Sequence, residues 1–335
     1  MKKVYLLTGA NGHLGRVLLA MLERIPDCEI RALILPGESG KDTNKVHYYH
    51  GDVCEPISME AFFAHLEGKS VYVIHTAGII DIQETVSPLL YAVNVTGTRN
   101  ITKLCLEHHV KRLLYTSSVH AIEEGDPLSV ITETTMFSPL RVHGGYAKTK
   151  AQASAIVMEA VKQGLDAVIV HPSGILGPYG NVQNHLIQMV VSYMNGNLLA
   201  AVSGGFDFVD VRDVAKGCLL ALEKGKAGEC YILSNRYYTI QEVLEMVRKE
   251  SGARKLNVMP IWLAKAALPF MTMYAKVKKQ RPLYTSYTLY TLQSNARFSH
   301  DKATKELGYA PRDLRETIHD TVRWYVKQQE RLNQA

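Results

Sequence analysis

Short apolar runs alternate with longer helical patterns through the first half of the chain. The apolar runs of strand length cover residues 3–8, 29–35, 46–50, 71–76, 112–116 and 167–171. Apolar residues at helical spacing follow several of them, most clearly over residues 88–109 and 144–163. Continuous apolar strands alternating with helices indicate a parallel sheet covered on both faces. Right-handed crossovers make such a sheet doubly wound, so the fold class is α/β of the Rossmann type.

This alternation of strand and helix patterns ends after residue 177. The later patterns predict strands at 206–211 and 231–233 and helices at 214–222, 240–251, 261–279 and 314–328. We expect these two strands and the helix between them to rejoin the first domain. The chain then divides into two units. These are a dinucleotide-binding Rossmann domain, 1–176 with 206–235, and a smaller, mostly helical substrate-binding lobe, 177–205 with 236–330.

Composition is that of an ordinary globular protein, with 335 residues, 47% hydrophobic and 21% charged. The net charge of +6 suits an anionic ligand such as a dinucleotide, and equally suits plain solubility. No basic run is interleaved with aromatic residues, so we expect no nucleic-acid partner.

The most apolar late segment, residues 261–273, is interrupted by Lys265 and Pro269. It is shorter than the roughly 20 apolar residues that a spanning helix needs, so we expect no membrane partner. The five cysteines are scattered and form no C-x-x-C pair, which is typical of a reducing compartment. A cytoplasmic location follows, and the absence of an H-E-x-x-H motif predicts no metal site.

A glycine-rich turn follows the first predicted strand and opens the first helix. Gly9 permits a sharp turn, Gly12 lets the backbone approach a pyrophosphate, and Gly15 lets the helix pack close to the sheet. The helix N-terminus then offers unpaired N–H groups to phosphate. The predicted cofactor-binding residues of this turn are Gly9, Asn11, Gly12, His13, Leu14 and Gly15.

The choice between NAD and NADP stays open. An acidic residue about 20 positions beyond the glycines normally binds the ribose of NAD, whereas a nearby arginine suits NADP. The second strand ends in Ile34-Leu35-Pro36-Gly37-Glu38, with no charge at its expected tip. Glu38 or Lys41 could reach the ribose from the following loop. Glu38 would favour NAD, and Lys41 would favour NADP.

Tyr146 and Lys150 lie four residues apart in a predicted helix, on one face. A fixed ammonium beside a tyrosine favours the phenolate, so we expect Lys150 to lower the pKa of Tyr146. Such a tyrosine can exchange a proton with a carbonyl oxygen as hydride is transferred. Tyr274 and Lys278 repeat the spacing, but they lie beyond the predicted sheet and are assigned to packing or the surface.

Several further motifs resemble the extended short-chain dehydrogenase/reductase family, in its dihydroflavonol 4-reductase and 3β-hydroxysteroid dehydrogenase branch. They run in the family's order along nearly the whole chain. The motifs are TGANGHLG (8–15), Gly51-Asp52-Val53, His75-Thr76-Ala77-Gly78, Asn94-Val95-Thr96-Gly97-Thr98, Thr116-Ser117-Ser118, Tyr146-x-x-x-Lys150, His171-Pro172-Ser173-Gly174, FVDVRDVA (208–215) and Leu307-Gly308-Tyr309-Ala310-Pro311.

The resemblance implies a role for each matching residue. Ser118, Tyr146 and Lys150 would be catalytic, with Asn94 ordering the active site. The implied cofactor contacts outside the turn are Asp52 and Val53 at the adenine, Ala77, Gly78, Pro172 and Ser173 near the nicotinamide, and Thr76, Thr116, Tyr146 and Lys150. Family members often dimerise through two long helices, here around Asn94 and Ala153, so a homodimer is expected.

The chain also departs from the family pattern. His171 stands where many relatives have arginine, and the second strand lacks the arginine of NADP-dependent reductases. Ser118 is followed by Val119-His120-Ala121, not by the Val-Tyr-Gly of nucleotide-sugar epimerases. The acidic pair of sugar-nucleotide dehydratases is absent too. These departures favour a reductase over a sugar-nucleotide enzyme.

The sequence therefore predicts reversible hydride transfer between NAD(P) and a carbonyl or secondary alcohol of a small organic substrate. One alternative is a nucleotide-sugar epimerase with tightly bound NAD. Another is a non-catalytic dinucleotide sensor, although such proteins usually lack the tyrosine. His120 and His143 flank the expected site. Candidate substrate contacts in the lobe are Tyr193, Trp262, Phe270, Met271 and Tyr274.

Overall fold

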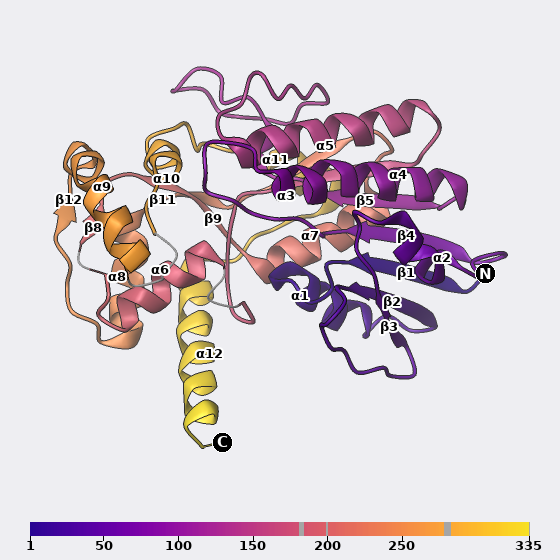
Figure 1. Cartoon of the computed structure of the whole chain (residues 1–335), viewed down its shortest axis with the longest axis horizontal. Coiled ribbons are helices and arrows are strands. Elements are labelled where there is room, and N and C mark those ends of the chain that lie inside the picture. Colours follow the sequence, from indigo (N-terminus) through magenta and orange to yellow (C-terminus); the bar gives the residue numbers. More distant parts are fainter. Residues whose placement is uncertain (181–183, 199, 278–282, 335) are drawn as a thin grey trace.

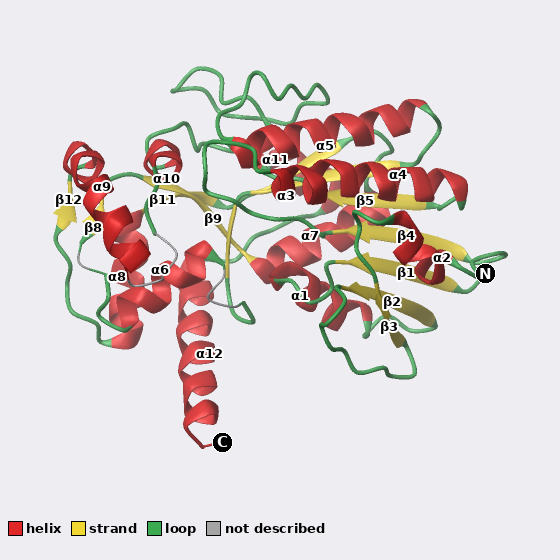
Figure 2. Cartoon of the chain, viewed as in Figure 1, coloured by secondary structure: helices red, strands yellow, loops and turns green. Residues whose placement is uncertain are grey.

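The computed structural model describes residues 1–180, 184–198, 200–277 and 283–334, and it is built on one large parallel sheet (Figures 1 and 2). The strands lie in the order β10-β6-β5-β4-β1-β2-β3, and every neighbouring pair is parallel. They are β1 (Lys3–Thr8), β2 (Cys28–Ile34), β3 (Val46–His50), β4 (Ser70–His75), β5 (Arg112–Thr116), β6 (Ala167–Pro172) and β10 (Cys230–Leu233). The predicted Rossmann-type fold is confirmed, because apolar continuity marks strands that are buried on both faces.

Helices cover both faces of this sheet and enclose two hydrophobic cores. One face is covered by α1 (His13–Leu22), α7 (Val211–Lys224) and α11 (Asp301–Leu307). The other is covered by α2 (Glu60–Phe63), which follows the short 3₁₀ turn Pro56–Met59, and by α4 (Thr98–Glu107) and α5 (Gly145–Lys162). α4 and α5 lie side by side in Figure 1 and pack on each other. Ala153 and Asn94 are buried within the chain, so a dimer face here would need their outward-facing neighbours.

The predicted helix over residues 88–109 is not uniform. It consists of α3 (Pro88–Tyr91), a π-helical turn at Ala92–Gly97, and α4. The wider turn carries Asn94, whose side chain is buried. π-helical turns are frequent at functional sites, and apolar spacing does not distinguish them from α-helix. A Cβ on Gly97 would stand 2.7 Å from Cγ2 of Val53, so glycine lets this turn pack against the loop after β3.

The lobe is mostly helical and has a hydrophobic core of its own. Its helices are α6 (His185–Met194), α8 (Ile240–Ser251), α9 (Ile261–Val277), α10 (Ser286–Thr291) and α12 (Leu314–Gln334). Two small sheets accompany them: β11 (Arg236–Thr239), β9 (Gly205–Asp210) and β7 (Gly174–Leu176), and the pair β12 (Val258–Met259) and β8 (Ala201–Val202). β10 joins the large sheet, whereas β9 pairs with β7 and β11. The division into two domains stays a prediction.

Three side-chain contacts fasten the lobe to loops at the carboxyl ends of the sheet. The Thr285 hydroxyl, which caps α10, donates to the backbone oxygen of Ile82 at 2.7 Å. The Asn295 amide donates to the backbone oxygens of Asp126 and Ser129 at 2.9 and 2.8 Å. α10 is thereby held over the loops that follow β4 and β5. Among the described residues, no helix combines the length and apolar character needed to cross a membrane.

Candidate active site

The glycine-rich turn has the backbone that the sequence predicts. Gly9 adopts φ +70°, and a Cβ there would stand 2.8 Å from the backbone nitrogen of Ala77. A Cβ on Gly15 would overlap the backbone oxygen of Gly9, so only glycine allows α1 to approach β1 this closely. α1 begins at His13 with Gly12 as its N-cap, and no side chain caps it. The first N–H groups of α1, including that of Leu14, are thus available to an anion.

Hydrogen bonds fix the turn to the end of β4. The Thr8 hydroxyl lies 2.8 Å from Nδ1 of His75, and Nε2 of His75 lies 3.1 Å from the Thr98 hydroxyl. Burial lowers the pKa of His75 to about 3, so the ring is neutral and joins two hydroxyls across the sheet. The Thr76 hydroxyl donates to the backbone oxygen of Thr8 at 2.7 Å. The Thr76 hydroxyl therefore holds the backbone next to the glycine-rich turn and is not free to contact a cofactor.

Other predicted cofactor residues are also held by the protein itself. The His13 ring contacts the backbone oxygen of Pro178 at 2.9 Å and the Asn184 amide at 3.2 Å, so it joins α1 to the lobe. A carboxylate oxygen of Asp52 accepts from the backbone nitrogen of Cys54 at 2.8 Å. The side chain of Val53 is buried in the core beneath α4.

Pro172 and Ser173 lie at the end of β6. The Ser173 hydroxyl donates to the carboxylate of Asp207 on β9, and burial raises the pKa of that carboxyl to about 6. This contact ties the large sheet to the small one. It also turns the serine hydroxyl toward β9, so Ser173 would meet a dinucleotide through its backbone.

Glu38 lies in the loop after β2, and its side chain contacts the glycine-rich turn. One carboxylate oxygen accepts from the Asn11 amide at 3.2 Å and from the backbone nitrogen of Leu35 at 3.0 Å. Of the two residues that the sequence left open, Glu38 is the one that contacts the turn. A carboxylate here can accept from the ribose hydroxyl of NAD, and it would repel the additional phosphate of NADP.

We predict that Glu38→Gln weakens the preference for NADH over NADPH by about tenfold, because it keeps the hydrogen bonds and removes one negative charge. Dissociation constants from fluorescence titration with both cofactors measure this ratio. Glu60→Gln, an exposed change on α2, is the matched control and should leave the ratio unaltered. An unchanged ratio in Glu38→Gln would show that selection lies elsewhere.

The structure brings Ser118 and Tyr146 together. The Ser118 hydroxyl lies beside that of Tyr146 and acts to lower its pKa, and both side chains are buried. Ser118 also caps the short turn Val119–Ala121, and its backbone oxygen lies 2.9 Å from Nδ1 of His171. The Ser117 hydroxyl instead lies 2.7 Å from that of Ser154 on α5. Of the two serines, Ser118 therefore lies beside Tyr146, whereas the hydroxyl of Ser117 is directed toward Ser154.

Lys150 is buried one helical turn beyond Tyr146 on α5. Its Nζ donates to the backbone oxygen of Thr116 at 2.8 Å and lies 3.5 Å from the Tyr115 hydroxyl. Burial lowers the pKa of Lys150 to about 7. A Cβ on Gly78 would stand 3.3 Å from this Nζ and 3.3 Å from Oδ1 of Asn94, so both groups lie close against the backbone of Gly78.

The acidity of Tyr146 differs from the expectation. Burial raises its pKa to about 12, while the hydrogen bond with Ser118 acts in the opposite direction. Lys150 does not lower the pKa of Tyr146, and burial lowers the pKa of Lys150 itself. Spacing along a helix places the two side chains on one face, but it does not reveal how far that face is buried from solvent. At neutral pH the phenol is therefore protonated.

Asn94 orders the loop between Tyr146 and the cofactor turn. Its amide donates to the backbone oxygen of Ile79 at 3.0 Å and to the Thr149 hydroxyl at 3.1 Å. Its oxygen accepts from the backbone nitrogen of Ile79 at 2.8 Å. These contacts join the loop after β4 to α5, which agrees with an ordering role.

Aromatic rings from both units surround Tyr146. The His120 ring meets Tyr146 edge-on at 6.1 Å between centroids and stacks on Phe206 at 5.1 Å. Tyr287 of α10 lies 6.0 Å from His120, and a Cβ on Gly144 would clash with its ring. The Tyr287 hydroxyl is buried without a hydrogen-bond partner among the described residues. Sequence reasoning missed Tyr287 and Phe206, because only the docking of the lobe brings them here.

The proposed lobe contacts do not gather at this site. The Tyr193 hydroxyl donates to the backbone oxygen of Arg254 at 2.9 Å, within the lobe. Trp262 and Phe270 are exposed on α9. The side chains of Met271 and Tyr274, and all of Lys278, lie outside the described residues. His143 is exposed and stacks on Tyr290, with ring centroids 4.1 Å apart.

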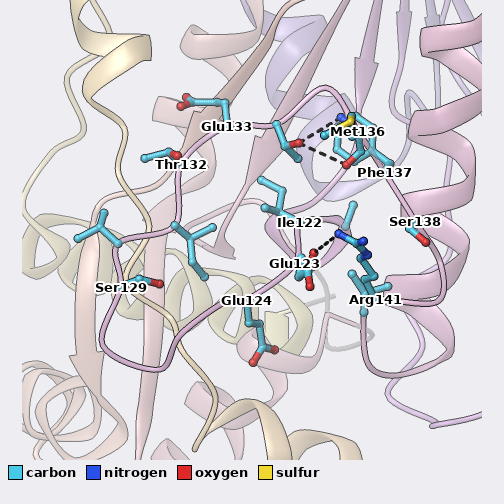
Figure 3. A pocket seen from close by; sticks show the side chains of 16 residues that line it. Ile122, Glu123, Glu124, Ser129, Thr132, Glu133, Met136, Phe137, Ser138 and Arg141 are labelled. Carbon is cyan, nitrogen blue, oxygen red and sulfur yellow. Dashed lines mark hydrogen bonds and ion pairs between the residues drawn. The ribbon is translucent and has the colours of Figure 1, made fainter.

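A cavity of about 580 Å³ lies under the segment that joins β5 to α5 (Figure 3). Its lining comes from residues 121–142 and includes the exposed side chains of Val130 and Met136. Arg141 crosses it and pairs with Glu123 at 3.2 Å. The lining adjoins Ser118 along the chain through Ala121 and contains neither Ser118 nor Tyr146. This cavity therefore lies next to Ser118 along the chain and does not contain the predicted catalytic residues.

The residues present fit a nicotinamide dinucleotide. The close backbone packing at Gly9 and Gly15 and the uncapped start of α1 suit a pyrophosphate, and the backbone of Gly78 lies beside Lys150. No cluster of three metal-ligating side chains occurs in the part of the chain that the structure describes.

Comparison with known proteins gives a consistent picture. The model of the NAD dependent epimerase/dehydratase family matches residues 5–234. "Sterol demethylase protein B" of Methylococcus capsulatus is 31% identical over 331 residues, covering 96% of this chain and 97% of the relative. A putative dihydroflavonol 4-reductase of Synechocystis is 30% identical and covers 97% and 95%.

Solved structures agree with the fold. The crystal structure of gox2253 has a TM-score of 0.79 and 29% identity, covering 97% of this chain and 98% of the other. A dTDP-glucose 4,6-dehydratase of Bacillus anthracis, in complex with NAD, has a TM-score of 0.76 at 20% identity and covers 98% of each chain. The second likeness concerns the fold alone.

Proposed function

Because the chain belongs to the NAD-dependent epimerase/dehydratase family, in the extended short-chain dehydrogenase/reductase group, we propose that it is a reductase of a ring-containing ketone. NAD(P) dependence and an enzymatic role follow from the family. The observation that carries the finer proposal is the buried juxtaposition of Ser118 and Tyr146, with Lys150 one turn away beside Gly78. Two relatives named for a sterol and for a dihydroflavonol support a ring-containing substrate.

The reaction needs a proton donor at the substrate oxygen. Tyr146, with its pKa raised to about 12, keeps its proton at neutral pH and can donate it to a carbonyl oxygen that Ser118 orients. Lys150, with a pKa near 7, can then return a proton toward the phenolate. The bound cofactor supplies the hydride. The rings of His120, Phe206 and Tyr287 exclude water from the reacting oxygen and offer flat apolar surfaces to a ring system.

The proposal is tested by following NADH and NADPH oxidation over a panel of cyclic ketones. A reductase consumes the reduced cofactor in proportion to the alcohol formed. A nucleotide-sugar epimerase would interconvert uridine-diphosphate sugars with no net cofactor consumption, and that result would overturn the proposal. Tight cofactor binding with no turnover on either panel would instead favour the dinucleotide sensor.

A further inference from the structure

Helix α9, at the outer end of the lobe, exposes large apolar side chains. Trp262, Phe270 and Met273 are 68%, 71% and 61% exposed. Their spacing along the helix places them on one side, with Ala266 between them. On the opposite side, Ala264 is buried and belongs to the lobe core. A helix that is apolar on both sides is normally covered on both sides.

The same region of the chain contains the protein's positive charge. Residues 252–300 include eight lysines and arginines and no aspartate or glutamate. The whole chain has 38 basic and 32 acidic residues, so the rest of the chain has 30 basic and 32 acidic residues and is slightly negative. Among the described residues, Arg254, Lys255 and Lys265 are exposed around α9. The positive net charge of +6 therefore comes from residues 252–300 and not from the rest of the chain.

We propose that the exposed face of α9, with these neighbouring cations, docks on an anionic membrane surface. Tryptophan and phenylalanine bind at the boundary between headgroups and acyl chains, while lysine and arginine are attracted to anionic lipid. α9 has 17 residues and contains Pro269, so it lies on the surface and does not span. The length argument that excluded a spanning helix does not apply here, because surface docking uses only one face of a helix.

Charge and apolarity together select this partner. Two copies joined through α9 would bring two strongly basic regions together, and their repulsion opposes such a dimer. A nucleic acid would satisfy the cations, but it would leave Trp262, Phe270 and Met273 without an apolar environment. An anionic bilayer satisfies both features of the surface.

The position of α9 gives docking a consequence for the site. Figure 1 shows α9 with β8, β12 and α8 at one end of the molecule, and β1 to β3 toward the other. α9 packs against α10, which carries Tyr287 next to the rings around Tyr146. Docking would place the substrate lobe, not the dinucleotide domain, against the bilayer. The docking surface itself does not depend on the proposed reductase activity.

Co-sedimentation of the full chain with vesicles tests the proposal. We expect at least about tenfold stronger binding to vesicles with phosphatidylglycerol than to pure phosphatidylcholine vesicles, and weaker binding as salt is raised. The double variant Trp262→Gln/Phe270→Gln should lose at least about tenfold of this binding. The control is Met136→Gln/Leu140→Gln, which changes side chains that are 85% and 92% exposed on another loop, and it should bind like the parent.

Fluorescence gives a readout that reports on α9 directly. The chain has two tryptophans, so Trp324→Phe leaves Trp262 as the single emitter. Its emission should shift to shorter wavelength with phosphatidylglycerol vesicles and not with phosphatidylcholine. Absence of vesicle binding by the folded protein would overturn the proposal. So would equal losses in both double variants, a dimer that Trp262→Gln/Phe270→Gln dissociates, or a Trp262 response to duplex DNA and not to vesicles.

Discussion

Tyr146→Phe should lose turnover by roughly 10²–10⁴-fold and keep its affinity for the dinucleotide. The change removes one hydroxyl, the only group of Tyr146 that can donate a proton to a substrate oxygen. The cofactor cradle at Gly9, Gly12 and Gly15 is built from backbone and is untouched. Stopped-flow measurement of kcat, together with fluorescence titration of the cofactor, separates the two effects.

Stability must be followed in the same variant, because the hydroxyl of Tyr146 is buried beside Ser118. Its loss should cost about 1 kcal/mol of unfolding free energy, too little to unfold an ordinary domain. Tyr274→Phe is the matched control, since it changes the other tyrosine that stands four residues before a lysine, and it should retain turnover. A Tyr146→Phe enzyme that still turns over would refute the proposed proton transfer.

Local sequence pattern was sufficient for the large sheet. All seven strands lie within one residue of the predicted ranges, because most of them are apolar runs that end where the buried part of the sheet ends. The glycine turn was equally predictable, since sterics at Gly9 and Gly15 admit no side chain.

Features set by tertiary contact were not predictable in this way. The π turn around Asn94 has the same apolar spacing as an α-helix. Tyr287 is 141 positions from Tyr146, and contacts between distant segments, such as those of Thr285 and Asn295 with loops of the sheet, bring it to the site. The pKa values of Tyr146 and Lys150 were misjudged for the same reason, since burial by residues remote in sequence determines them. Sequence therefore predicts which chemical groups act, and burial in the fold sets their protonation.

Lys150→Met should abolish most turnover and yet make the protein no less stable near neutral pH. The methionine has a similar shape and carries no charge, so it removes the cost of burying an amine. Turnover should fall by roughly 10²–10⁴-fold, because no other described group takes the place of Nζ beside Gly78 and Thr116. Steady-state kinetics and urea unfolding at several pH values measure both effects.

The lowered pKa of Lys150 determines how the stability difference between Lys150→Met and the parent changes with pH. Burial lowers the pKa of Lys150 from 10.5 to about 7, so between these values the unfolded chain binds one more proton than the folded one. This lysine therefore reduces stability progressively as pH falls from about 10.5 to 7, by at most about 1.4 kcal/mol per pH unit. The advantage of Lys150→Met over the parent should grow from pH 10 to pH 7 and level off below. Lys148→Met, an exposed change on the same helix, should show no such trend. A constant difference across pH would mean that the amine remains charged in the folded protein, and the proton relay through Lys150 would then have to be abandoned.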